Sequence, residues 1–283
     1  MRSVATTPAA RGLLKGATAE IAAGGCQTPR LDAEVLLAHV LGVGRERILS
    51  DPGLTLAEAQ LGLFRAAVRR RALAREPVAY IVGRRAFREI ELAVDGRALV
   101  PRPETELLVE CALALPAGAH VLDVGTGCGA VALALAHERP DLELSGSDLS
   151  EQALELARLN SRRLDLDVRW LRSDLLAQIA DEFDAVVANL PYIAEGESAN
   201  LAPEIVEHEP PEALFAGPDG LSAIRALMSQ LRRRRRVRFV ALEVGAGQAG
   251  AVAELLRACG FRRLRRERDL AGIERVLVAE GRL

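Results

Sequence analysis

Aromatic residues and net charge are both scarce in this sequence. Phenylalanine, tryptophan and tyrosine together make up 3% of the 283 residues, and the formal net charge at pH 7 is −2. An enzyme that flips a DNA base into its active site needs an aromatic pocket and a basic surface for the phosphate backbone. Composition therefore gives no support to nucleic-acid or membrane binding driven by bulk charge, and we expect no direct DNA partner.

Cysteine is sparse, and its spacing argues against metal or disulfide sites. Cys26, Cys111, Cys128 and Cys259 are far apart, and none forms a C-x-x-C pair. This pattern favours free thiols in a reducing compartment. The first 20 residues have no apolar core of signal-peptide length, and no apolar run reaches the roughly 18 residues of a membrane span. We expect a cytoplasmic, monomeric protein without a metal or a membrane partner.

What the sequence does contain is enough apolar material for two domains, since 49% of its residues are hydrophobic. Residues 8–75 carry apolar side chains at helical spacing, and Thr55 is placed to cap the last of these helices. Residues 77–100 alternate around Asp95-Gly96, which predicts a β-hairpin with its turn at that pair. The predicted domains are a helical N-terminal domain at 1–76, a linking β-hairpin at 77–103 and a C-terminal domain at 104–283.

The C-terminal domain alternates between strand and helix patterns. Strands are predicted at 120–124, 142–147, 168–171, 183–188, 238–244, 261–269 and 274–280, and helices at 104–115, 130–136, 151–164, 221–233 and 248–258. This alternation predicts an α/β fold with a mainly parallel, doubly wound sheet. The last two strands are joined through Ala271-Gly272, which indicates an antiparallel hairpin at one edge.

A glycine-rich turn follows the first strand of this domain, in "HVLDVGTGCGAVALALA". Gly125, Gly127 and Gly129 allow the backbone to approach a ligand, and the helix that follows presents free N–H groups. Asp148 ends the next strand, where a carboxylate can accept hydrogen bonds from a ribose diol. The spacing fits a dinucleotide such as NAD, and it also fits S-adenosylmethionine, so both ligands remain open.

The stretch "FDAVVANLPYIAEGE" ends a buried strand in Asn189-Leu190-Pro191-Tyr192. Open α/β sheets bind ligands outside the carboxyl ends of their strands, so Asn189 should face the same crevice as the glycines. The Asn189 side-chain oxygen and the Leu190 carbonyl are two acceptors, and Pro191 restricts the backbone between them. Two fixed acceptors can hold a planar –NH2 group and aim its nitrogen at an electrophile.

These motifs resemble class I S-adenosylmethionine-dependent methyltransferases that methylate amino groups. The stretches "VPRPETELLVE", "EPPEALFAGPDGLSAIRAL" and "LEVGAGQAGAVAELLRACGF" are similar to segments of the HemK/PrmC family of protein-(glutamine-N5) methyltransferases. The resemblance implies a Rossmann-like fold, S-adenosylmethionine as the cofactor, and peptide chain release factors as partners whose Gly-Gly-Gln glutamine is methylated. We assign the N-terminal helices, as a hypothesis, to gripping that protein substrate.

The resemblance assigns roles to particular residues. The cofactor would be held by Gly125, Thr126, Gly127, Cys128, Gly129 and Asp148, with Leu175 near adenine, and with Asn189, Arg102 and Thr105 near the methionine part or the site entrance. The substrate glutamine would be held by Asn189, Leu190, Pro191 and Tyr192.

Two departures from the family pattern and three alternatives stay open. Leu190 replaces the first proline of the usual Pro-Pro pair, and the arginine run Arg232–Arg236 replaces a turn before a strand. That run is expected to be a solvated helix end, since cations are favoured at a helix C-terminus, and the other interpretation is that it binds ribosomal RNA or an acidic partner surface. The alternatives are a DNA adenine-N6 methyltransferase, a non-catalytic translation-associated binding protein and a NAD-dependent dehydrogenase.

Overall fold

The computed structural model describes residues 10–51 and 53–282, which form two compact units. One unit holds the described residues up to Gly83 together with Ala202–His208, and the other holds the remainder. Residues 8 and 9, where the predicted helical stretch begins, lie outside the described residues, as does the rest of the first nine residues of the predicted N-terminal domain.

The first unit is helical, as the spacing of its apolar residues predicted. Its helices are α1 (Ala10–Ala23), α2 (Pro29–Leu41), α3 (Arg45–Ser50), α4 (Glu58–Leu73), α5 (Val78–Val82) and α9 (Pro203–Val206). Ile21, Leu36, Leu37 and Phe64 are fully buried and form the centre of its core. The predicted cap at Thr55 is wrong: the N-cap of α4 is Ala57, whose backbone N–H donates to the side chain of Gln60 (3.0 Å).

Helix α9 belongs to this unit although it lies far along the sequence. Glu204 on α9 accepts hydrogen bonds from Arg71 (3.0 Å) and Arg75 of the α4 region. His208 pairs through its ring with the carbonyl of Ala74 (2.6 Å). The helical unit therefore includes a short segment from the second half of the chain.

The second unit begins with an antiparallel hairpin of β1 (Arg84–Phe87) and β2 (Ile90–Ala93). Phe87 pairs with Ile90, so the turn lies at Arg88-Glu89 and not at Asp95-Gly96 as the sequence predicted. The Asp95 carboxylate instead accepts hydrogen bonds from the backbone and side chain of Arg97. These bonds stabilise a local turn at Asp95 that does not join two strands.

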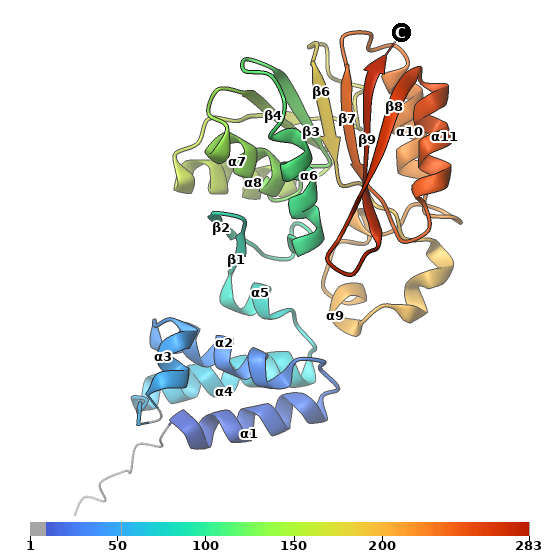
Figure 1. Ribbon diagram of the computed structural model, residues 1–283. Coiled ribbons are helices and arrows are strands. Elements are labelled where there is room, and N and C mark those ends of the chain that lie inside the picture. The colour runs from blue at the N-terminus through green and yellow to red at the C-terminus, as the bar shows by residue number, and fades with distance from the viewer. Residues whose placement is uncertain (1–9, 52, 283) are drawn as a thin grey trace, which may run out of the picture. The chain divides into compact units, whose positions relative to one another are not determined.

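The main sheet of the second unit has the strand order β5-β4-β3-β6-β7-β9-β8 (Figure 1). Its strands are β3 (His120–Val124), β4 (Glu143–Asp148), β5 (Arg169–Arg172), β6 (Ala185–Ala188), β7 (Phe239–Glu243), β8 (Phe261–Arg268) and β9 (Glu274–Arg282). The first five strands in that order are parallel, and β8 and β9 add an antiparallel edge hairpin. The predicted doubly wound sheet with an edge hairpin is confirmed.

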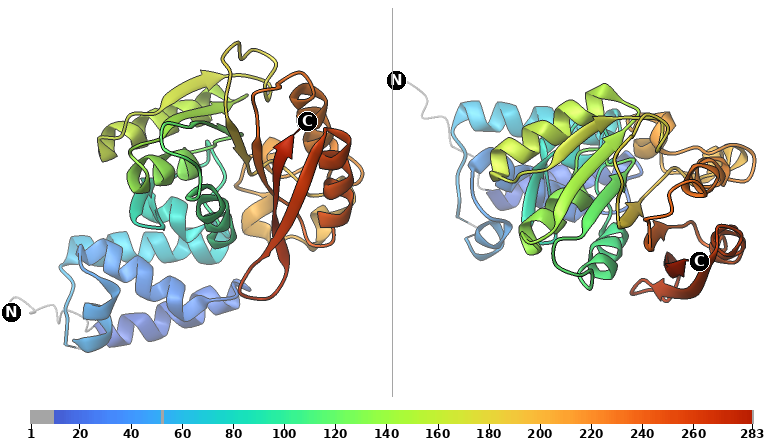
Figure 2. Two further views of the ribbon diagram at one scale, coloured as in Figure 1. Left: turned by 45° about the horizontal axis from the view of Figure 1, so that its top comes forward. Right: turned by 90° about the horizontal axis from the view of Figure 1, so that it is seen from above.

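Helices cover both faces of this sheet (Figure 2). These are α6 (Glu106–Ala112), α7 (Ala130–Glu138), α8 (Glu151–Leu164), α10 (Ser222–Leu231) and α11 (Ala249–Ala258), with short 3-10 turns η1 (Pro103–Thr105), η2 (Glu195–Asn200) and η3 (Pro211–Ala213). On the face of α10 and α11, buried side chains of β3, β6 and β7 form one core cluster with both helices. The central strands are apolar on both faces because both are covered.

The register of the sheet places the ends of four strands in one row. Val124 of β3 pairs with Ser147 of β4 and with Ala188 of β6, and Ala188 pairs with Leu242 of β7. The next residues along these strands are Gly125, Asp148, Asn189 and Glu243. The pairing therefore brings these four residues together at the carboxyl edge of the sheet.

Candidate active site

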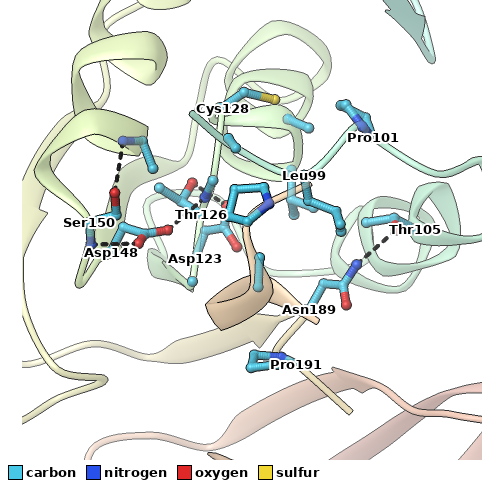
Figure 3. A pocket seen from close by; sticks show the side chains of 18 of the residues that line it. Leu99, Pro101, Thr105, Asp123, Thr126, Cys128, Asp148, Ser150, Asn189 and Pro191 are labelled. Atoms are coloured by element: carbon cyan, nitrogen blue, oxygen red, sulfur yellow. Dashed lines mark hydrogen bonds between the residues drawn. The ribbon is translucent and has the colours of Figure 1, made fainter. Parts of the chain in front are cut away.

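The candidate site lies where the strand order reverses. From β3 the chain crosses to β4 on one side, whereas from β6 it crosses to β7 on the other. Open α/β sheets bind ligands in the crevice at this switch point. A cavity opens there, and Figure 3 shows many of the side chains that line it. The lining residues are Arg97–Leu99, Pro101, Arg102, Thr105, Asp123, Gly125–Cys128, Ala130, Val131, Asp148, Ser150, Ala153, Asn189, Pro191, Pro210, Glu212 and Ala213.

The glycine loop turns sharply between β3 and α7. The N–H groups of Gly125 and Thr126 both donate to the carbonyl of Ser147 on β4, at 2.8 and 2.9 Å. Gly129 has a φ of 87°, and a Cβ there would lie 2.9 Å from the ring of Trp170. The loop is therefore held against the neighbouring strand, and a larger residue at position 129 would collide with the half-buried ring of Trp170.

Asp148 connects the glycine loop to the start of α8. One carboxylate oxygen accepts from the N–H of Gly127 and the other from the N–H of Ser150, each at 2.9 Å (Figure 3). Burial raises the pKa of Asp148 above its ordinary value, and these backbone hydrogen bonds oppose the increase. The carboxylate keeps further lone pairs that a diol of a bound ligand could use.

Asp123 lines the same cavity and was not singled out from the sequence. Its Oδ2 accepts from the Thr126 hydroxyl (2.6 Å) and from the N–H of Ala132 (3.3 Å), and its side chain is almost fully buried. Burial raises the pKa of this carboxyl to about 7. In the sequence it appears only as a polar residue within a buried strand, a weak signal that gave no reason to choose it.

Asn189 lies on the opposite side of the cavity from Asp148. Its Nδ2 donates to the hydroxyl of Thr105 at 3.0 Å (Figure 3), and within residues 10–51 and 53–282 no hydrogen bond is made to its Oδ1. Thr105 was expected near the methionine part of the cofactor; it lines the cavity and also contacts Asn189 directly.

The residues after Asn189 divide their side chains between core and cavity. Leu190 is 4% exposed and packs into the core cluster of β6, α10 and α11. Pro191 lines the cavity. Tyr192 donates its hydroxyl to Glu243 (3.3 Å), and its backbone carbonyl accepts from Gln248 (2.8 Å). The turn after Asn189 is therefore fixed both by a backbone hydrogen bond and by the contacts of its side chains.

Arg102 points to a buried acid at the edge of the cavity. Its guanidinium donates to both carboxylate oxygens of Glu209, at 2.6 and 2.7 Å. Burial acts to raise the pKa of Glu209 above its usual range, and the charge of Arg102 opposes that increase. The pair joins the loop before η1 to the chain segment that follows α9.

Four predicted site residues lie outside the cavity lining, and one of them is Leu190, whose side chain is in the core cluster. Gly129 is the N-cap residue of α7, and Tyr192 contacts Glu243. Leu175 is half-buried against the core cluster with a φ of 53°. Its contact with adenine stays a prediction.

No group of three or more His, Cys, Asp or Glu side chains among the described residues is arranged to hold a metal ion. No helix within residues 10–51 and 53–282 is long and apolar enough to span a bilayer.

Comparison with known proteins decides the family. Residues 12–83 match the family model described as PrmC N-terminal domain, and residues 103–218 match the methyltransferase small domain. The release factor glutamine methyltransferase of Caulobacter vibrioides is 40% identical over 261 residues, which cover 90% of each chain. That of Coxiella burnetii is 39% identical over 259 residues, covering 89% of this chain and 92% of the relative.

The chain belongs to the release factor glutamine methyltransferase family. The expected HemK/PrmC membership is thereby confirmed, and with it the enzyme class of a methyltransferase. Among solved structures, a methyltransferase from Pyrococcus furiosus matches with a TM-score of 0.54 at 16% identity, covering 81% of this chain and all of that one. This likeness shows the class I methyltransferase fold, and the dehydrogenase alternative does not survive membership of the glutamine methyltransferase family.

Proposed function

We propose that this protein transfers a methyl group from S-adenosylmethionine to the side-chain amide nitrogen (N5) of the glutamine in the Gly-Gly-Gln motif of peptide chain release factors. Membership of the release factor glutamine methyltransferase family supports the substrate. The observation that carries the chemistry is the Oδ1 of Asn189, which accepts no hydrogen bond from the described residues, in the same cavity as the glycine loop and Asp148.

The residues present fit S-adenosylmethionine. Asp148 offers a carboxylate for the ribose diol, at the tip of β4 beside the loop. A Cβ added at Gly127 would meet only Ala98 within 4 Å, so the backbone there leaves room for a ligand. The bound cofactor would supply an electrophilic methyl group on its sulfonium sulfur.

The work of the chain in this reaction is positioning. The Oδ1 of Asn189 and the carbonyl of Leu190 would each accept one hydrogen of the glutamine –NH2 group. An amide nitrogen is a weak nucleophile because its lone pair is delocalised into the carbonyl. Holding both hydrogens favours loss of planarity and aims the lone pair at the methyl group. Pro191, which cannot donate a hydrogen bond, keeps the backbone at this point restricted.

The organisation of the chain into two units supports different roles for its two parts. We assign the cofactor and the transfer to residues 104–283, and recognition of the release factor to the helical residues 1–76, with residues 77–103 linking them. We also propose that the protein acts as a monomer in the cytoplasm. Within the arginine run Arg232–Arg236, Arg234 donates to the carbonyls of Leu176 (3.1 Å) and Asp181 (3.2 Å), which supports a structural role for that arginine.

The test is methylation of a purified release factor with labelled S-adenosylmethionine, followed by mass spectrometry of the Gly-Gly-Gln peptide. We expect a single methyl group on the glutamine. Asn189→Ala should lower kcat at least 100-fold, because the missing acceptor costs about 3 kcal/mol in the transition state, while the cofactor Kd changes only a few-fold. Equal loss of turnover and cofactor binding would show that Asn189 mainly holds the cofactor.

Two outcomes would favour the alternatives. Label on adenine of DNA, with none on the release factor, would support a DNA adenine-N6 methyltransferase. Binding of the release factor without any transfer, in a protein that binds the cofactor, would support a non-catalytic binding role. A matched control is Asn200→Ala, which removes an exposed asparagine at the end of η2.

A further inference from the structure

Residues 209–216 form part of the cavity wall and are fixed at their far end. Three of them line the cavity: Pro210, Glu212 and Ala213. Ile193, the residue after Asn189–Tyr192, donates its N–H to the carbonyl of Leu214 (3.0 Å) and accepts from the N–H of Ala216 (2.9 Å). The end of segment 209–216 is therefore bound to the chain that directly follows the proposed catalytic residues.

The beginning of this segment is fixed by an ion pair between Glu209 and Arg102. Nη2 of Arg102 donates to both carboxylate oxygens of Glu209, at 2.6 and 2.7 Å. The Glu209 side chain is 2% exposed, and that of Arg102 is 30% exposed. In the sequence, Arg102 lies between Pro101 and Thr105, which also line the cavity (Figure 3). The ion pair therefore joins two parts of the cavity wall that are 107 residues apart in the sequence.

Between these two attachments the chain is stiff. Pro210 has a φ of −59°, and Pro211 begins the 3-10 turn η3. The N–H of Ala213 donates to the carbonyl of Pro210 (3.0 Å), and that of Phe215 donates to the carbonyl of Pro211 (3.0 Å). Because proline rings restrict φ, this stretch has few ways to bend. A displacement of Glu209 would therefore move the residues that line the cavity.

The carboxylate of Glu209 is stable in its buried position only while Arg102 compensates its charge. Removal of one partner of a buried ion pair leaves an unpaired charge, so the remaining group moves toward water or changes its protonation. Pro210, the next residue, would move with it. We propose that Arg102 and Glu209 are positioning residues whose ion pair holds residues 210–213 against bound S-adenosylmethionine. Arg102 thus serves the cofactor through the cavity wall and not by contacting it.

The wall that is held in this way closes the cavity on the side of Asp148. Burial is the main cause of the raised pKa of Asp148, and the negative charge of Glu212 adds to it, so these two acids are close to each other. Asp148 is the acid proposed for the ribose diol. Displacement of residues 210–213 should therefore weaken cofactor binding more than it slows methyl transfer. The inference rests on the cofactor of the proposed function and does not depend on which substrate is methylated.

The first test measures backbone amide exchange in the protein without cofactor. Arg102→Met removes the guanidinium and keeps much of the apolar stem. We expect the amides of residues 212–216 to exchange at least about ten-fold faster than in the wild type, because the segment loses its attachment at Glu209. The amides of strand β3 should not change. The control Arg257→Met removes an exposed arginine that pairs with Glu254 on α11, and it should leave exchange in residues 212–216 unchanged. Equal exchange of this segment in Arg102→Met and the wild type would overturn the inference.

The second test measures the Kd for S-adenosylmethionine by calorimetry. Arg102→Met should raise this Kd at least about ten-fold, because it leaves Glu209 buried and unpaired. Glu209→Met should raise it only about three-fold, because the partly exposed Arg102 can turn its charge toward water. The double variant should also bind within about three-fold of the wild type, since an apolar pair of similar volume can replace a buried ion pair. Rescue of Arg102→Met by a second change at Glu209 is the sign of residues that act through each other. If the double variant binds as weakly as Arg102→Met, Arg102 contacts the cofactor itself and the inference is wrong.

Turnover separates this inference from the proposed function. With S-adenosylmethionine at saturation, kcat of Arg102→Met for release factor methylation should be within about three-fold of the wild type, because the defect lies in cofactor binding. A loss of kcat with an unchanged cofactor Kd would contradict the inference. If amide exchange and cofactor binding change as expected but the wild type methylates no release factor, the proposed substrate fails and the positioning role stands. Should Arg102→Met not fold, the double variant decides alone: a wild-type cofactor Kd supports the inference, and a Kd raised about ten-fold contradicts it.

Discussion

At the scale of single residues, the candidate site divides into what a local pattern can reveal and what it cannot. The glycines, Asp148 and Asn189 each end a strand beside turn residues, so their role could be predicted from short stretches. Asp123 and Glu243 are acids within buried strands, and the sequence shows no reason for either. Their partners come from neighbouring strands and loops, which only the strand order and register bring together.

Leu190 shows how the structure accommodates a departure from the family motif. Its side chain fills the core cluster, and its Cδ2 would lie 3.0 Å from a Cβ at Gly125. A leucine here therefore packs the Asn189 turn against the glycine loop, whereas the proposed chemistry requires only the Leu190 carbonyl. Packing and catalysis are assigned to different atoms of one residue.

Leu190→Ala should separate these two roles. Removal of the buried side chain should lower the free energy of unfolding by about 2–4 kcal/mol, the usual cost of a cavity of this size. Well below the melting temperature, kcat should fall less than ten-fold, because the carbonyl is retained. Urea denaturation and methylation kinetics measure the two effects. The control Leu227→Ala, on α10 in the same core cluster, should destabilise similarly and leave kcat unchanged. A loss of kcat as large as that of Asn189→Ala would show that the side chain sets the carbonyl angle.

At the scale of secondary-structure elements, the order of strands and helices followed from periodicity, whereas one turn did not. The alternation around Asp95-Gly96 indicated a hairpin, but the turn lies at Arg88-Glu89. Arg88 has a φ of 47°, and its guanidinium contacts Glu138 on α7 (2.8 Å) and Glu110 on α6 (3.3 Å). Ion pairs with two helices fix this turn, and a pattern local to the hairpin does not contain them.

Substitutions at Arg88 test that explanation. Arg88→Ala keeps the left-handed backbone and loses the half-buried ion pairs, so we expect a loss of about 1–2 kcal/mol in the free energy of unfolding. Arg88→Gly should cost about 1 kcal/mol less, since glycine adopts positive φ without strain. Asp95→Ala, at the turn that the sequence favoured, should cost less than Arg88→Ala. The reverse order in chemical denaturation would place the decisive turn at Asp95.

At the scale of the whole molecule, the chain passes between its two units three times. It leaves the helical unit after Gly83, returns at Ala202 and leaves again after His208. No periodicity in the sequence distinguishes residues 202–208 from the loops around them, so the predicted boundary at residue 76 came without a returning segment. The returning segment connects to the Asn189 turn on one side and to Glu209 on the other, so the helical unit holds part of the loop that follows the proposed catalytic residues.

Glu204 holds this returning segment, because Arg71 is only 5% exposed and pairs with both Asp32 (2.7 Å) and Glu204 (3.0 Å). Burial acts to raise the pKa of Glu204, but backbone hydrogen bonding and the hydrogen bonds from Arg71 and Arg75 outweigh it, so the pKa lies below its usual range. A carboxyl with a lowered folded-state pKa stabilises the fold above its unfolded pKa, and that stability is lost as pH falls through the folded value.

Glu204→Ala should therefore lower the free energy of unfolding at pH 7 by about 1–3 kcal/mol, with Asp32 still neutralising Arg71. The segment 202–208 should become sensitive to limited proteolysis and exchange its amides faster. Glu204→Gln keeps the size and loses the charge, so its deficit against wild type should be constant between pH 6 and 8 and shrink below about pH 4.5, where glutamate in the unfolded chain is protonated. Glu207→Gln, an exposed acid directly after α9, is the control. A deficit that does not shrink in acid would mean that Glu204 acts through packing, and unchanged proteolysis of Glu204→Ala would mean that another contact holds the segment.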